Sequence, residues 1–145
     1  MRMRLNRRAV SSSAALLAMI WSIAGCGSSS KPTSPSPTIV GHSYTSTSVT
    51  GHAMAAGTKV TLRFGTDGKL SASAGCNTLS GNFLIEKGQL VAGQLAMTEM
   101  ACIPASRQTQ DAWLAGVLDA RPQLMQTGTT LTVTAGATTI TMAES

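Results

Sequence analysis

The three cysteines, Cys26, Cys76 and Cys102, carry the most specific chemistry that this sequence offers. A thiol can accept an acyl chain, join a second thiol in a disulfide or, where its surroundings favour the thiolate, act as a nucleophile. Cys26 stands between a short apolar stretch and a run of serines, whereas the other two cysteines lie in the body of the chain. Cys26 therefore needs a separate explanation from the other pair.

The first 25 residues have the composition of an export signal. Residues 1–8 contain four arginines and no acid, residues 9–23 contain no charge, and two small residues precede Cys26. A basic end, a short apolar core and a small-residue boundary are typical of a signal peptide. The core is shorter than the roughly 20 apolar residues that a membrane-spanning helix needs. We predict a signal peptide over residues 1–25.

The run Ile23-Ala24-Gly25-Cys26 resembles the bacterial lipobox. The resemblance implies that the Cys26 thiol receives a diacylglycerol, that the chain is cleaved before it, and that the exported protein is lipid-anchored to the bacterial cell membrane or envelope. The alternatives are an ordinary cleaved signal with a free Cys26, or an uncleaved anchor. Residues 27–38 hold no large apolar side chain, so residues 26–38 are predicted to be a Ser/Pro-rich tether.

The charge of the exported chain differs from that of the whole sequence. The full chain has 11 basic and 6 acidic residues, for a net charge of +5, but four of the arginines lie in residues 1–8. Their removal leaves seven basic residues against six acids, a net charge of +1. Aromatic residues for stacking on bases are also scarce, at 3%. We therefore predict no nucleic-acid partner.

With Cys26 lipidated, Cys76 and Cys102 form an even pair in an oxidising compartment, and we predict a disulfide between them. Closing a loop of about 25 residues would stabilise a small domain by about 3 kcal/mol. The alternative is a reactive thiol, since Cys102 lies just before a predicted helix, where a thiol pKa can fall.

The residues needed for catalysis or metal binding do not form a recognisable set. His42 and His52 are the only histidines and have no ligand-spaced partners, whereas a zinc or copper site needs three or four donors. Asp111 and Asp119 lie eight apart on the predicted helix and are interpreted as solvated charges. No nucleophile elbow or phosphate-binding loop occurs. We predict no catalytic residue, no metal, no cofactor and no enzyme activity.

The remaining residues, 39–145, are long enough for one domain. Apolar and polar residues alternate in Lys59–Phe64, where Val60, Leu62 and Phe64 share one face. Glycine-containing turns separate further short strands. The other predicted strands are Lys69–Ala74, Asn82–Glu86, Gln89–Val91, Gln123–Gln126, Thr129–Thr134 and Thr138–Met142.

One segment, Pro104–Ala120, lacks this alternation. Its apolar residues Trp113, Leu114, Val117 and Leu118 recur at helical spacing. Pro104 is tolerated in a first helical turn, and Pro122 limits continuation at the other end. We predict a helix of about 14 residues, with Trp113 as its main core anchor.

Two segments resemble the META domain, also called the HslJ-like domain. Ala74–Phe83, AGCNTLSGNF, is similar to the family's GCN…G.Y signature, and Leu95–Cys102, LAMTEMAC, is similar to its LA.T.MAC segment. The resemblance covers Val40–Met142. Phe83 replaces a common Tyr, and Tyr44 replaces the usual N-terminal Trp, which leaves the first strand undefined.

The resemblance implies an α+β fold, in which antiparallel strands form a curved sheet or partly open barrel with one helix packed against it. It also implies envelope location or stress-linked roles, and no known set of catalytic residues. The cysteine-linked loops are the candidate interaction surface, represented by Asn77 and Thr98. Alternatively, Asn77 only bonds local backbone groups.

These observations predict a membrane-tethered, non-enzymatic binding module with a protein or another envelope component as its partner. One alternative is a carrier of a lipid or small apolar ligand, for which Met54, Met97, Met100, Met125 and Met142 are candidate lining residues. Another is an inhibitor of a secreted hydrolase.

Overall fold

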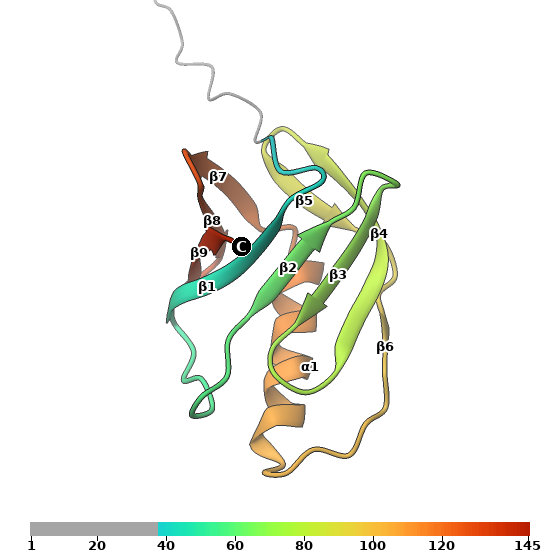
Figure 1. The fold of residues 1–145 in the computed structure, drawn as a ribbon, viewed down its shortest axis with the longest axis vertical. Helices are drawn as coiled ribbons and strands as arrows, with labels where there is room; N and C mark the ends of the chain where they lie inside the picture. The colour runs from blue at the N-terminus through green and yellow to red at the C-terminus, as the bar shows by residue number, and fades with distance from the viewer. Residues whose placement is uncertain (1–37) are drawn as a thin grey trace, which may run out of the picture. The chain divides into compact units, whose positions relative to one another are not determined.

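The computed structural model describes residues 38–145, which form nine strands and one helix (Figure 1). The predicted signal peptide and Cys26 lie outside the described residues. The strands are β1 (Ser43–Thr50), β2 (Thr61–Phe64), β3 (Lys69–Ser73), β4 (Thr78–Glu86), β5 (Gln89–Ala92), β6 (Ala96–Met97), β7 (Gln123–Thr127), β8 (Thr130–Ala135) and β9 (Thr138–Glu144). The helix, α1, spans Ser106–Asp119.

Eight of these strands close into an antiparallel barrel. Neighbours follow the order β1-β2-β3-β4-β5-β7-β8-β9, and β9 pairs with β1 to complete the ring. β3 also pairs with β4, from Lys69↔Asn82 to Ser73↔Thr78. The barrel is therefore closed, whereas the sequence predicted a curved sheet or partly open barrel. The β5–β7 junction is narrow, with one pair, Gln89↔Gln123. The short β6 pairs alongside the first half of β4.

The alternation of side chains predicted for the strands places the core inside this barrel. In β2, Leu62 and Phe64 are buried while Thr61 and Arg63 are exposed. Because successive side chains of a strand point to opposite faces, this pattern requires one solvent face and one core face. Phe64 contacts Tyr44 and Phe83 edge to face, with ring centroids 6.1 and 5.2 Å apart. Side chains therefore fill the barrel interior.

The strand boundaries are close to those predicted, with three exceptions: β4 starts early, and β1 and the two-residue β6 were not predicted. β4 begins at Thr78, four residues before the predicted start at Asn82, because the chain pairs with β3 directly after the Cys76–Asn77 turn. β1 had no clear signal, since its second half alternates only weakly. Tyr44 nevertheless lies fully buried within β1.

The helix α1 packs against the barrel beside β4 and β5 (Figure 1). Its buried apolar residues are Leu114 and Leu118, both 0% exposed, and Val117. Trp113 was wrongly predicted as the main anchor: it is only partly buried, and its ring stacks on His52 at a centroid distance of 4.0 Å. Within the described residues, no helix has the length and apolarity to cross a membrane.

Candidate functional site

Asn77 is the centre of a buried polar network that joins three segments. It follows Cys76 directly and is 1% exposed. Its side-chain Oδ1 accepts hydrogen bonds from the Thr98 hydroxyl at 2.9 Å and from the Met100 main-chain N–H at 2.8 Å. Thr98 in turn accepts a bond from the Thr78 N–H at 3.1 Å. The Asn77 side chain thereby fixes the course of the loop that follows β6.

The other side of Asn77 faces the helix. Its main-chain N–H and its Nδ2 both donate to Oδ2 of Asp111, at 2.7 and 3.2 Å. Asp111 is 0% exposed, so the interpretation of this residue as a solvated charge was wrong. Asp119, two turns later, is exposed as predicted. Helical spacing alone could not separate them, because the loop that buries Asp111 comes from a distant part of the sequence.

A disulfide ties the same segments together. Cys76 and Cys102 are bonded in the structure, with Cα atoms 6.1 Å apart, a distance that suits a disulfide. The loop between β6 and α1, residues 98–105 (hereafter the β6–α1 loop), is thus attached to the Cys76–Asn77 turn covalently and through Met100. Two attachments therefore hold this loop, although it has no regular secondary structure.

The candidate interaction surface therefore needs correction at one of its two residues. Asn77 cannot present its side chain to a partner, because it is buried and its amide is used in internal bonds. The alternative, that Asn77 bonds only local backbone groups, is also wrong, because its partners Thr98, Met100 and Asp111 belong to distant segments. Thr98 is exposed, but its hydroxyl also bonds inward to Asn77. The surface offered to solvent is formed by other residues of the β6–α1 loop.

A second buried polar residue of the helix, Gln110, secures the loop between β1 and β2. Its Oε1 accepts a bond from the Ala55 N–H at 2.6 Å, and its Nε2 donates to the Thr58 hydroxyl at 2.8 Å and to the Ala74 carbonyl. Gly75 is required beside this contact. Its φ is +118°, and a Cβ there would lie 2.7 Å from Cγ2 of Thr58.

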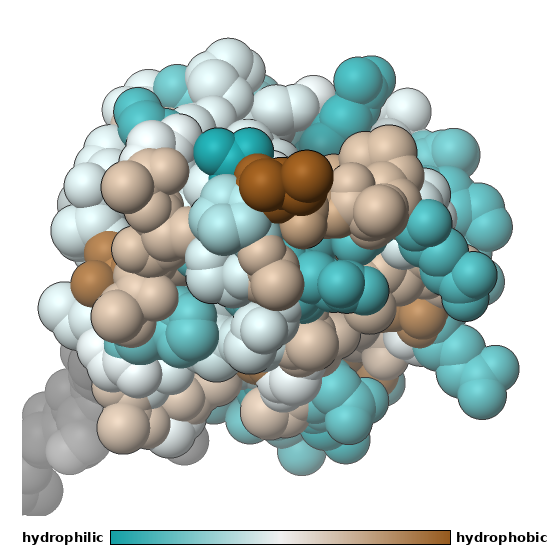
Figure 2. Space-filling view, turned by 90° about the horizontal axis from the view of Figure 1, so that it is seen from below, coloured by the Kyte–Doolittle hydropathy of each residue, from teal (hydrophilic) through white to brown (hydrophobic). Residues whose placement is uncertain are grey.

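The exposed apolar side chains near the disulfide are Met97, Met100 and Ile103, which we name the apolar cluster. They are 40%, 56% and 90% exposed. Figure 2 views the molecule from the end that is lowest in Figure 1, and brown and tan atoms gather over part of this end. The β6–α1 loop lies at the bottom of Figure 1, whereas the described chain begins at the top. No pattern in the sequence selects Ile103, since solvent exposure depends on the packing around the loop.

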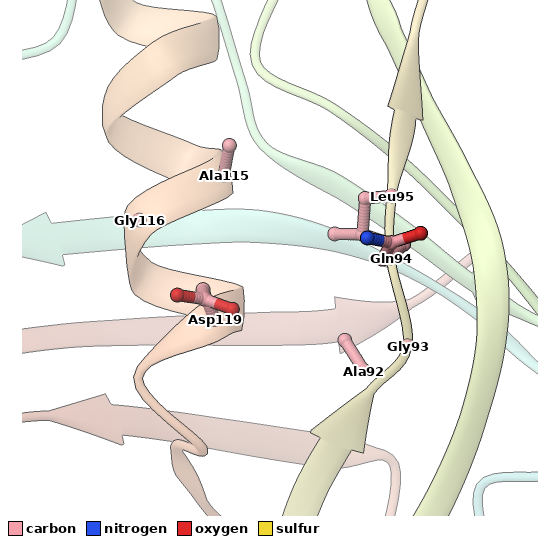
Figure 3. Close-up of a pocket in the computed structure, with 7 residues that line it drawn as sticks. All are labelled: Ala92, Gly93, Gln94, Leu95, Ala115, Gly116 and Asp119. Atoms are coloured by element: carbon pink, nitrogen blue, oxygen red, sulfur yellow. The ribbon is translucent and has the colours of Figure 1, made fainter.

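A cleft of about 520 Å³ separates the helix from the segment that joins β5 to β6 (Figure 3). Ala115, Gly116 and Asp119 line it from α1, and residues 92–95 line it from the other side. Gly81 permits the close approach of residues 94 and 95, because a Cβ there would lie 2.7 Å from the Gln94 carbonyl oxygen. Asp119 is the one ionisable group in the lining, so the cleft holds no acid–base pair.

The two histidines do not meet. The His42 Nδ1 lies 2.5 Å from a carboxylate oxygen of Glu144, and His52 stacks on Trp113. The candidate methionines also diverge: Met142 is in the core, whereas Met97, Met100 and Met125 are exposed. Within residues 38–145, neither a histidine-based metal centre nor a methionine-lined cavity is formed.

Comparison with known proteins agrees with this architecture. The family model described as META domain matches residues 37–145. A protein from Burkholderia xenovorans, solved by NMR, is 22% identical with a TM-score of 0.61, over 74% of this chain and 83% of that one. A second NMR structure is 28% identical with a TM-score of 0.59, over 71% of this chain and 88% of the other. No curated protein matches this chain significantly.

Proposed function

The chain belongs to the META domain family, and we propose that it is a non-enzymatic binding module of the bacterial envelope, lipid-anchored through Cys26. Membership of this family supports a non-enzymatic role. The proposed partner is a folded envelope protein with an apolar recess. The observation that carries the proposal is the exposed apolar cluster, of which Met100 and Ile103 lie on a loop held by a disulfide and by Asn77.

The two attachments of the β6–α1 loop support a role in binding. Ordering a flexible loop on association costs about 0.5–1.5 kcal/mol per immobilised side chain. Here the Cys76–Cys102 bond and the Met100 N–H bond hold the main chain before any partner arrives. An isoleucine that is 90% exposed on such a support is suited to fill an apolar pocket of a partner, as interface anchors do.

The position of the apolar cluster also fits a tethered protein. The described chain begins at the end of the barrel opposite to the β6–α1 loop (Figure 1). A tether attached at that end leaves the cluster free to face away from the point of attachment. This arrangement favours a protein partner over the membrane that carries the anchor. An inhibitor of a secreted hydrolase is the other alternative, in which the cysteine-linked loops would contact the enzyme.

The carrier alternative has less support. Nineteen buried hydrophobic residues form the core, and aromatic rings occupy the barrel interior. The cleft beside α1 is lined partly by glycine and polar residues, which suits an acyl chain poorly. Native mass spectrometry of protein purified from its host would distinguish the two: a co-purified small apolar ligand in stoichiometric amount would replace our proposal by the carrier.

The lipid anchor is tested by metabolic labelling with a fatty acid. We expect the wild-type chain to incorporate the label and to sediment with membranes, and Cys26→Ser to lose both properties. Equal labelling of the variant would contradict the proposed lipidation site.

The binding surface is tested by photo-crosslinking in intact cells. A photoreactive residue at position 103 should give one reproducible protein adduct, and the same residue at Leu84, which is 63% exposed in β4, should not. In pull-downs with the identified partner, Ile103→Ser should weaken binding at least tenfold while Leu84→Ser leaves it unchanged. Equal adducts from both positions, or unchanged binding by Ile103→Ser, would remove the apolar cluster as the interface.

A further inference from the structure

We propose that Cys76, Cys102 and Asp111 form a Zn²⁺ site when the disulfide is reduced. The two Sγ atoms and a carboxylate oxygen of Asp111 all lie within 4.8 Å of one another. Among residues 38–145, this is the one group of three such side chains that converge so closely. In the oxidised chain the sulfurs are bonded to each other, so the ligands become available only after reduction.

The unpaired carboxylate oxygen of Asp111 is an independent observation that favours a bound cation. Its Oδ2 accepts two bonds from Asn77, but its Oδ1 is buried and has no hydrogen-bond partner. Burying an ionised carboxylate without full compensation is costly. A cation bound between the carboxylate and the two sulfurs would remove that cost. The bonds from Asn77 would then orient the ligand, as outer-shell bonds commonly do at metal sites.

The ligand set has the chemistry of a zinc site. Thiolate and carboxylate ligands bind Zn²⁺ at about 2.3 and 2.0–2.2 Å, and three protein ligands leave one position for water. Sulfurs around a tetrahedral ion lie about 3.8 Å apart. The Cα atoms, 6.1 Å apart, allow that separation by rotation of the side chains. Two thiolates also favour zinc over magnesium or calcium, which prefer oxygen.

The Cys76–Cys102 disulfide must be reduced before zinc can bind, and an external dithiol is the reductant. The dithiol supplies two electrons and two protons, is itself oxidised to a disulfide, and converts the Cys76–Cys102 bond into two thiols. Zn²⁺ then displaces both thiol protons into solvent as the thiolates bind. The metal would thus replace the covalent link between the β6–α1 loop and the Cys76–Asn77 turn. This inference does not depend on the proposed binding function.

The Arg107 side chain is the alternative to Zn²⁺ as a partner for Oδ1 of Asp111. It lies one turn before Asp111 on α1, and its Nε is also buried without a hydrogen-bond partner. No ion pair joins the two residues in the structure, where the salt bridges of the described residues are His42–Glu144 and Arg121–Glu86. If the proposal is correct, Arg107→Gln should tighten zinc binding, because it removes a positive charge near the site.

The experiment uses the full chain with Cys26→Ser, so that this thiol cannot contribute a ligand. The protein is reduced with a dithiol, freed of reductant without oxygen, and titrated with Co²⁺ and then Zn²⁺. We expect thiolate-to-cobalt charge-transfer absorption, its loss on adding zinc, and one Zn²⁺ per reduced chain by elemental analysis. The oxidised chain should bind none. Absence of binding by the reduced chain, or equal binding by the oxidised chain, would overturn the proposal.

The role of Asp111 is separated from that of the sulfurs by a matched pair of variants. Asp111→Asn should weaken zinc binding at least about tenfold, while Asp119→Asn, on the same helix but exposed, should bind as the parent does. Circular dichroism of the oxidised variants checks that they fold. Should Asp111→Asn not fold, the thermal midpoint of the reduced parent is decisive: zinc should raise it, and an unchanged midpoint contradicts the site.

Discussion

The two halves of α1 attach to the rest of the molecule by different chemistry. The first half uses Gln110 and Asp111, which bond to the loop between β1 and β2 and to the Cys76–Asn77 turn. The second half uses Leu114, Val117 and Leu118, which pack into the core. Each half is buried on one side, yet the first reads as hydrophilic in the sequence.

The apolar half of the helix contributes mainly to stability, whereas the polar half determines where the helix and its neighbouring loops lie. Apolar burial is nondirectional and grows with the area removed from water, so Leu114 and Leu118 supply attraction with little preference for one exact placement. Hydrogen bonds have strict geometry, so Gln110 and Asp111 select one placement of the helix relative to two loops. The β6–α1 loop, which carries Met100 and Ile103 of the apolar cluster, is therefore positioned by the polar half of the helix.

The largest effect is expected from Leu118→Ala in the apolar half. The side chain is 0% exposed, and truncating a buried leucine lowers the free energy of unfolding by about 2–5 kcal/mol. Urea denaturation should show a lower midpoint with an unchanged slope. Leu84→Ala, which removes the same atoms at a 63% exposed position, is the control and should stay within about 0.5 kcal/mol of wild type.

Asp111→Ala should lower the free energy of unfolding by about 2 kcal/mol. It removes the acceptor of two hydrogen bonds from Asn77, each worth about 1.5–3 kcal/mol to a charged group, but also relieves the burial of a charge. The loss should be accompanied by faster proteolysis of the β6–α1 loop, which Leu118→Ala should not show under native conditions. A loop equally resistant in both variants would contradict the division between the halves.

Gln110→Ala should cost about 1–2 kcal/mol, since it leaves the Ala55 N–H without its acceptor. Hydrogen exchange should reveal the effect locally: the Ala55 amide should exchange faster, while the Met100 amide, bonded to Asn77, should keep its protection. Faster exchange at Met100 would mean that the two polar residues act as one unit.

The smallest effect is expected far from the helix, at Tyr44, the single tyrosine of the chain. Burial, reinforced by the negative charge of Glu144, raises the pKa of Tyr44 above its ordinary value of 10.0. The folded chain keeps the phenol proton to higher pH than the unfolded chain, so stability is complete below pH 10 and falls as pH rises toward the folded pKa. Absorbance titration should give a midpoint above 10.0, and Glu144→Gln should lower it.

Local patterns in the sequence were enough to predict most of the elements. Alternating residues such as Leu62 and Phe64 require a half-buried strand, and the spacing of Leu114 and Leu118 requires a helix with one apolar side. The helix was predicted at its observed length. The Cys76–Cys102 pairing followed from the parity of the cysteines and the expected compartment, not from geometry. These features depend on neighbours in the sequence or on residue counts.

Tertiary structure alone decided which polar residues are buried and which apolar ones are exposed. Asp111 and Asp119 are the same residue type on the same helix, yet only Asp111 lies beneath the Cys76–Asn77 turn. Ile103, apolar by type, is 90% exposed although the disulfide and Asn77 attach its loop to the barrel. The physical reason is that burial depends on which distant segments meet, and those meetings are set by barrel closure rather than by local propensity.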